Sequence, residues 1–133
     1  MPDAMNDIFD KIIAREIPAQ FVYEDNICVV VMDKFPVVEG QVLIIPRDCE
    51  AYAFRLPDAT YAHILMVAKR IAGALDKTYN TLRTCLLIEG FEVAHTHIKL
   101  YPVTKREFHV HGGSEVSNES LQIEAEKIKA NLV

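Results

Sequence analysis

The spacing of apolar residues changes several times along the chain, and each spacing predicts a different structural element. Apolar residues at positions 8, 9, 12 and 13 follow the period of a helix, so a first helix is predicted over residues 8–15. Asn6 or Asp7 can cap its N-terminus, because short polar side chains accept hydrogen bonds from the first free backbone N–H groups. Pro18 follows and is expected to end the helix.

Two further helices are predicted from single apolar stripes. The longer one opens at Pro57 and Asp58, because a proline and an acidic residue both suit a first helical turn. Its stripe, which faces either the sheet or a second subunit, consists of Ile64, Ala68, Ile71, Leu75 and Tyr79. The C-terminal helix, over residues 118–131, carries the stripe Leu121, Ala125, Ile128 and Leu132.

About five strands are predicted between these helices, over residues 21–23, 27–32, 42–45, 84–88 and 93–103. Residues 24–26 read as a hairpin turn between the first two strands, and Glu89 and Gly90 as the turn between the last two. Connections this short favour antiparallel pairing. The expected fold is therefore α+β, an antiparallel sheet of about five strands with flanking helices, in a single domain over residues 1–133.

The amino-acid composition argues against several classes of function. Fourteen basic residues against nineteen acidic ones give a formal net charge of −5, which argues against nucleic-acid binding through charge alone. No apolar run approaches the roughly 20 residues of a membrane span, and the first ten residues do not resemble a secretory signal. The three cysteines are widely spaced, and Cys28 and Cys85 are expected to be buried small hydrophobic residues. A cytoplasmic protein without a disulfide framework is predicted.

The most informative segment contains two histidines and a lysine at alternating positions, His95, His97 and Lys99. On a strand, these three side chains would line one face about 7 Å apart, while Ala94 and Thr96 would point to the core side. Two imidazoles and an ammonium group in a row form a site suited to binding an anion. A neutral imidazole beside a cation can also attack phosphorus or transfer a proton near pH 7.

This segment resembles the motif of the histidine-triad (HIT) nucleotide hydrolases and transferases, His-x-His-x-His after a Gly-x-x-Val lead. Residues 90–99 here read Gly-Phe-Glu-Val-Ala-His-Thr-His-Ile-Lys. Residues 8–19 resemble the opening helix of that family, and residues 33–47 resemble its aspartate and Pro-basic strand segment. The similarity covers about residues 6–103. It implies an antiparallel sheet with flanking helices, a homodimer packed through the long helix and the sheet, and a purine nucleotide or nucleotide conjugate as ligand.

The resemblance also implies roles for individual residues. His97 stands at the middle histidine, the family's nucleophile, and His95 at the first, which helps to set the tautomer and orientation of the middle one. Asp33 matches the acidic residue that binds the ribose hydroxyls, and Gly90 the glycine that allows close approach to the phosphate. The apolar side of the base pocket matches Ile8, Phe9 and Ile12.

The chain departs from the family pattern at several of these positions. Lys99 stands in place of the third histidine; a lysine binds phosphate well but is a poorer proton donor at neutral pH unless it is desolvated. Glu92 lies near the phosphate position, where its carboxylate would repel the nucleotide unless Lys99 or Arg106 offsets it. Asp7 and Asp10 stand where zinc-binding members have a Cys-x-x-Cys pair, and Cys49 replaces a histidine that is common after the Pro-basic segment. With His95, these residues form a ligand mixture unlike the sets that structural zinc prefers, so no metal and no cofactor are expected.

Several of these residues also have a purely structural interpretation. His97 could be a surface histidine, Asp33 a turn residue, and the apolar residues of the first helix ordinary core. His109 and His111 form a second pair to which the sequence assigns no role.

The leading hypothesis is a hydrolase or transferase of nucleoside monophosphate derivatives, either a purine phosphoramidate or a dinucleoside polyphosphate. Its mechanism would use a nucleotidyl-histidine on His97, with Lys99 neutralising phosphate charge. The competing hypothesis is a nucleotide-binding module or sensor that has lost turnover because the triad is incomplete. A third is a structural dimer with a vestigial pocket.

Overall fold

The computed structural model describes residues 7–133. Along the chain, these residues form the elements α1 (Ile8–Ile13), β1 (Phe21–Glu24), β2 (Cys28–Met32), β3 (Val42–Pro46), the short 3-10 helix η2 (Ala53–Arg55), α2 (Asp58–Tyr79), β4 (Arg83–Leu87), β5 (Ile98–Val103) and α3 (Asn118–Ala130). The α+β class and the number of strands predicted from the sequence are confirmed.

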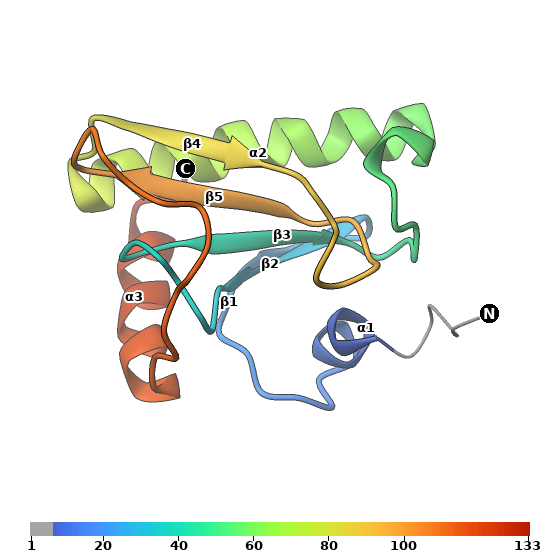
Figure 1. The fold of residues 1–133 in the computed structure, drawn as a ribbon, viewed down its shortest axis with the longest axis horizontal. Coiled ribbons are helices and arrows are strands. Elements are labelled where there is room, and N and C mark those ends of the chain that lie inside the picture. The colour runs from blue at the N-terminus through green and yellow to red at the C-terminus, as the bar shows by residue number, and fades with distance from the viewer. Residues whose placement is uncertain (1–6) are drawn as a thin grey trace.

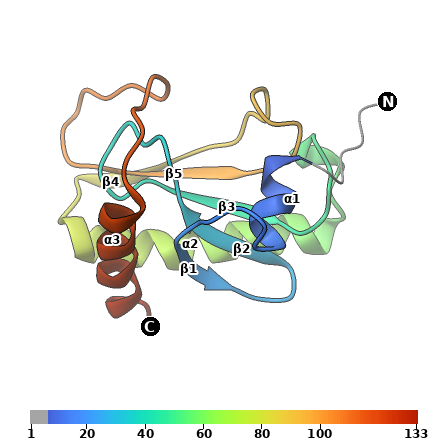
Figure 2. The same cartoon turned by 90° about the horizontal axis from the view of Figure 1, so that it is seen from below.

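All five strands form one antiparallel sheet in the order β1-β2-β3-β5-β4. Helix α2 packs along β3, β5 and β4, and α3 packs against β1, β2 and α2. Figure 2 shows α1 and the longer connecting loops on the side of the sheet away from α2. Each face of the sheet is therefore covered differently, by long helices on one side and by α1 with loops on the other.

The residues of β2 and β3 alternate between two buried clusters. Val30 and Ile44 belong to the larger cluster beneath α2 and α3, whereas Val31 and Leu43 belong to the smaller cluster beneath α1. This explains why both strands read as continuous apolar runs, because a strand buried on both faces has no polar side. The smaller cluster contains Phe9, which brings α1 onto the sheet.

The apolar stripes predicted for the two long helices face this core. Ile64, Ala68, Ile71 and Leu75 of α2 are buried in the larger cluster, with Tyr79 packed at its edge. The α2 stripe thus serves the sheet of its own chain, which decides between the two alternatives that the sequence left open. Within residues 7–133, no helix combines the length and the hydrophobicity needed to cross a membrane.

Helix α1 is shorter than predicted. Asp7 is its N-cap, with its side chain accepting a hydrogen bond from the backbone N–H of Asp10 at 2.8 Å; Asn6, the alternative cap, lies outside the described residues. The helix ends at Ile13 rather than at residue 15, and before Pro18 is reached, because Arg15 adopts a left-handed conformation with a φ of 61°.

The strand predicted over residues 93–103 is wrong in its first half, since β5 begins only at Ile98. The backbone N–H of Thr96 bonds to the carbonyl of Glu50 at 2.7 Å, and that of His95 to the carbonyl of Val93 at 2.8 Å. These bonds hold the chain off the sheet, so residues 88–97 form a long connection between β4 and β5. His95 and His97 consequently lie before the strand, and Ala94, which was expected on the core side, is exposed.

Asp25 holds the β1–β2 turn against α2. Its Oδ1 accepts hydrogen bonds from the backbone N–H groups of Ile27 and Cys28, and its Oδ2 lies 2.7 Å from both the Tyr23 hydroxyl and Nε2 of His63. Burial raises the pKa of the Asp25 carboxyl, but these four bonds outweigh burial and hold the pKa well below its usual range.

We therefore expect Asp25→Ala to lower the free energy of unfolding by about 2–3 kcal/mol at pH 7, since hydrogen bonds to charged groups contribute about 1.5–3 kcal/mol. A depressed pKa in the folded state stabilises above the pKa of the unfolded carboxyl, about 3.9, and the contribution is lost as the pH falls further. Urea unfolding of both proteins should show their difference shrinking below pH 4. A difference that stays constant from pH 7 to pH 3 would contradict this role.

Candidate functional site

A cavity of about 620 Å³ lies on the face of the sheet that carries α1, within the size range of small-molecule sites. Val31 and Leu43 form its floor, and Ile8, Phe9 and Ile12 of α1 form an apolar wall. Its polar lining includes Asp33, Gln41, Glu92, His97, Lys99 and His111. One side of the cavity therefore suits an apolar planar group, and the other an anion.

His97 is buried, and its ring is fixed in one tautomer by the main chain. Its Nδ1 lies 2.8 Å from the carbonyl oxygen of His95. A carbonyl oxygen can only accept, so Nδ1 carries the proton and Nε2 keeps its lone pair. Burial and the neighbouring Lys99 lower the pKa of His97, outweighing the opposite influence of the bond to His95 and of Asp33. The imidazole is consequently neutral near pH 7, the form that acts as a nucleophile or base.

Lys99 lies in β5, where it pairs with Leu43 of β3 and Leu87 of β4. Its Nζ is 3.2 Å from a carboxylate oxygen of Glu89, and the same carboxylate lies 3.0 and 3.1 Å from Nε2 of His111. Burial raises the pKa of the Glu89 carboxyl, but the bonds from His111 and Lys99 outweigh burial and lower it overall. Glu89 thus joins the sheet to the loop that carries His111.

Asp33 follows β2 and is held in place by its neighbours. One carboxylate oxygen accepts from the backbone N–H of Phe35 at 2.9 Å, and the other accepts from the side-chain amide of Gln41 at 2.7 Å. Burial raises the pKa of the Asp33 carboxyl, outweighing the hydrogen bonds from Phe35 and Gln41 and the nearby Lys99, which lower it. Gln41 is itself buried and accepts a bond from Val37, so the carboxylate orientation is fixed from two sides.

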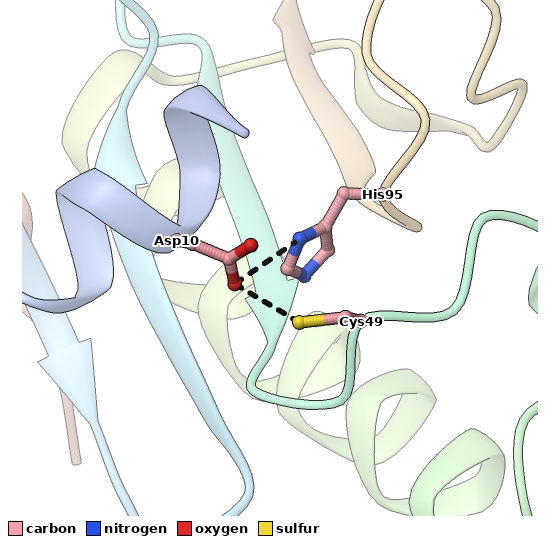
Figure 3. Close-up of side chains that lie close together, drawn as sticks. All are labelled: Asp10, Cys49 and His95. Atoms are coloured by element: carbon pink, nitrogen blue, oxygen red, sulfur yellow. Dashed lines mark hydrogen bonds and ion pairs between the residues drawn. The ribbon is translucent and has the colours of Figure 1, made fainter. Parts of the chain in front are cut away.

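His95 does not line the cavity; its ring points away from it into a cluster of polar side chains beneath α1. Its Nε2 lies 2.8 Å from the carbonyl of Pro46, and its Nδ1 lies 3.0 Å from Asp7 and 3.8 Å from Asp10. Figure 3 shows Asp10 between His95 and Cys49, whose thiol donates to the Asp10 carboxylate at 3.1 Å. His95 is therefore placed to position His97 through its backbone rather than to react.

The residues of this cluster fit a structural zinc ion poorly. Asp10, Cys49 and His95 bring potential ligand atoms within 4.8 Å of one another, and Oδ2 of Asp10 has no hydrogen-bond partner among the described residues. Structural zinc sites are built mainly from Cys and His, however, whereas this cluster offers one thiol and one imidazole beside the carboxylates of Asp7 and Asp10. Both ring nitrogens of His95 are already hydrogen-bonded. No chemical step is assigned to a metal here.

The structure brings most of the residues selected from the sequence into one cavity: Ile8, Phe9, Ile12, Asp33, Glu92, His97 and Lys99. Gly90 does not line it; this glycine has a φ of 73° in the β4–β5 connection, and a side chain there would meet the carbonyl of Ala51. The sequence analysis missed Gln41, Glu89 and the position of His111. No local pattern marks the first two, and the His109–His111 pair was noted without a role.

Comparison with known proteins connects this geometry to a family. A family model described as the HIT domain matches residues 14–106. The adenosine 5'-monophosphoramidase of Schizosaccharomyces pombe is 31% identical over 127 residues, covering 95% of this chain and 92% of that protein. An uncharacterized HIT-like protein of Borreliella burgdorferi is 30% identical over 129 residues, covering 92% and 90%.

A solved structure of a Hit-like protein from Bartonella henselae, described as involved in cell-cycle regulation, superimposes with a TM-score of 0.85 at 25% identity. The match covers 96% of this chain and 97% of that one. The family model covers most of the chain, and the sequence relatives and the solved structure match nearly all of it. The chain therefore belongs to the HIT family.

Proposed function

We propose that this chain binds a purine nucleoside monophosphate derivative in the cavity and hydrolyses it, or transfers its nucleotidyl group, through a covalent intermediate on His97. The observation that carries the proposal is the His97 ring. Its Nδ1 proton is held by the His95 carbonyl, which leaves Nε2 as a neutral nucleophile beside the Lys99 ammonium. The name of the related Schizosaccharomyces pombe protein, adenosine 5'-monophosphoramidase, supports a phosphoramidate as the substrate class.

The shape and polarity of the cavity support this ligand. The base would pack against Ile8, Phe9 and Ile12, and the Asp33 carboxylate would accept hydrogen bonds from the ribose hydroxyls. The α-phosphate would then lie between His97 and Lys99. The ammonium of Lys99 neutralises charge on the phosphate oxygens, a contribution that increases as the transition state forms.

In the proposed reaction, Nε2 of His97 attacks the α-phosphorus and the leaving group departs. Water then attacks the same phosphorus and breaks the phosphorus–nitrogen bond to the histidine. The paired carboxylate of Glu89 reduces the positive charge that Lys99 offers, which is the observation that favours the second candidate, a binding module without turnover.

The deciding measurement is release of adenosine monophosphate from adenosine phosphoramidate by the purified protein. We expect steady release, together with a nucleotide adduct on His97 that is labile in acid and is found by mass spectrometry after rapid quenching at high pH. Nucleotide binding with neither release nor adduct would favour the binding module. Absence of binding would contradict both candidates and support the structural reading.

We further propose that the chain forms a homodimer. β4 is an edge strand of the sheet, so its outer edge has no strand partner among residues 7–133, and Leu86 in this strand and Leu82 just before it are 46% and 59% exposed. An open, apolar edge of this kind is a template for association. Sedimentation velocity should give a mass near twice 15.0 kDa. A monomer at tens of micromolar concentration would contradict the proposal.

A further inference from the structure

The β5–α3 loop, residues 104–117, brings a second histidine to the cavity that contains His97. His111 lines this cavity, whereas His109, two residues earlier on the same loop, does not. The sequence separates His111 from His97 by a strand and a loop, so only the fold brings the two residues to one site. The loop is visible in Figure 1 as the orange connection that runs from β5 to α3.

The loop is anchored on both sides of His111. On one side, the hydroxyl of the buried Tyr101 donates to the carbonyl of Val110 at 3.1 Å. On the other side, Gly113 lies so close to the backbone carbonyls of Phe35 and Pro36 that a side chain at this position would overlap them. The position of His111 at the cavity is therefore set by contacts of the main chain on either side.

Glu89 fixes the orientation of the His111 ring. The carboxylate accepts from Nε2 at 3.0 and 3.1 Å, so Nε2 carries a proton and Nδ1 is the ring nitrogen that can gain or lose one. The side chain is 54% exposed, so the ring is in contact with solvent as well as with the cavity. An imidazole held by a carboxylate in this way is a common arrangement of a general acid–base.

Resting on the proposed function, we propose that His111 is the general acid–base of the reaction at His97. It would provide proton transfer near pH 7, for which an imidazole is suited and a lysine ammonium is not, while Lys99, which is held by Glu89, would bind the phosphate charge. Lys99 and His111 would then divide two tasks between them, one binding the phosphate and the other protonating the leaving group.

With adenosine phosphoramidate, the proposed reaction has two steps. The lone pair of His97 Nε2 forms a bond to phosphorus while the bond from phosphorus to the amino group breaks, and the departing nitrogen takes the proton of His111 Nδ1 to leave as ammonia. In the second step, the oxygen of water forms a bond to phosphorus, the bond from His97 to phosphorus breaks, and His111 Nδ1 takes a proton from the water. The products are ammonia and adenosine monophosphate, and both histidines are restored.

The test compares two substrates that differ in their need for a proton. The amino group of adenosine phosphoramidate must be protonated to leave, whereas the p-nitrophenyl ester of adenosine monophosphate releases p-nitrophenolate as an anion. We expect His111→Ala to lower kcat on the phosphoramidate by about 10²–10⁴-fold, the usual contribution of a general acid–base, and to lower kcat on the ester by less than about tenfold. His109→Ala is the matched control and should leave both rates unchanged.

His111→Gln separates proton transfer from loop positioning. Glutamine can donate a hydrogen bond to Glu89 but cannot deliver a proton, so we expect it to be as slow as His111→Ala on the phosphoramidate. Added imidazole should restore part of the His111→Ala rate on this substrate. Wild-type rates in His111→Gln, or equal losses on both substrates, would overturn the role of His111 alone. Failure of the wild-type protein to turn over either substrate would overturn the proposed function, and this role with it.

Discussion

His97→Ala is expected to abolish turnover of adenosine phosphoramidate, with a loss in kcat of roughly 10⁴-fold or more, as for other nucleophiles of covalent catalysis. The reason is that Nε2 of His97 is the atom proposed to form the bond to phosphorus, and Lys99 cannot replace it because its ammonium has no lone pair. Nucleotide affinity should fall by no more than about tenfold, since one neutral hydrogen bond contributes about 0.5–1.5 kcal/mol. Steady-state kinetics and calorimetric titration with adenosine monophosphate measure the two effects.

His97→Asn is the matched variant for this experiment. Its amide can donate to the His95 carbonyl as Nδ1 of His97 does, but it has no nitrogen at the position of Nε2. We expect this variant to fold, to bind nucleotide and to form no adduct. Turnover within tenfold of wild type in either variant would exclude His97 as the nucleophile.

The lowered pKa of His97 predicts how kcat/KM depends on pH. Because burial and Lys99 favour the neutral ring, outweighing Asp33 and the bond to His95, its lone pair stays available at pH values below the usual histidine pKa of about 6.5. We therefore expect the acid limb of kcat/KM that reports the nucleophile to lie below pH 6.5.

Gly40→Ala is expected to produce the largest loss of stability, about 3 kcal/mol. Gly40 has a φ of 84°, a conformation that alanine adopts only with strain, and a Cβ there would overlap ring carbons of Tyr79 at the end of α2. The ring cannot move aside freely, since it packs against the larger core cluster and its hydroxyl donates to Glu124 of α3. Overpacking of this kind usually costs about 1–3 kcal/mol, to which the backbone strain adds.

Gly73→Ala is the control for this substitution. Gly73 lies in the interior of α2, where an added Cβ has no neighbour within 4 Å, so alanine should stabilise the protein by about 0.5–1 kcal/mol. Urea unfolding of the two variants should therefore shift in opposite directions. A loss below about 1 kcal/mol for Gly40→Ala would show that Tyr79 and the loop before β3 can rearrange at little cost.

The sequence predicted those parts of the fold that depend on local periodicity. The spacing of apolar residues depends directly on which side chains are buried. The positions of α2 and α3 could therefore be predicted from their apolar stripes, and those of β2 and β3 from their apolar runs. Residues 88–97 could not be predicted in the same way. The backbone bond from Thr96 to Glu50 that keeps this connection off the sheet joins residues far apart in the sequence. So does the bond from the His95 ring to the Pro46 carbonyl, and no local pattern records such pairings.

The candidate site, too, could be predicted from the sequence only in part. His97 and Lys99 were selected from their alternating positions before the family resemblance, whereas Asp33 and the apolar residues of α1 were selected through it; all of them line one cavity. Gln41 and Glu89 were missed because each acts by holding another side chain, which depends on the folded geometry alone. His111 belonged to a recognised pair, but its relation to Glu89 depends on the path of the β5–α3 loop.

The hydrogen bond between His97 and the main chain of residue 95 has a consequence for how the site can vary. Every amino acid offers a backbone carbonyl, so the acceptor that sets the His97 tautomer does not depend on which side chain stands at position 95. Substitutions there act by loosening the anchor to Pro46 and Asp7, whereas an insertion or deletion between Gly90 and His97 would move the acceptor itself. Relatives should therefore tolerate changes of residue type in this connection far better than changes of its length.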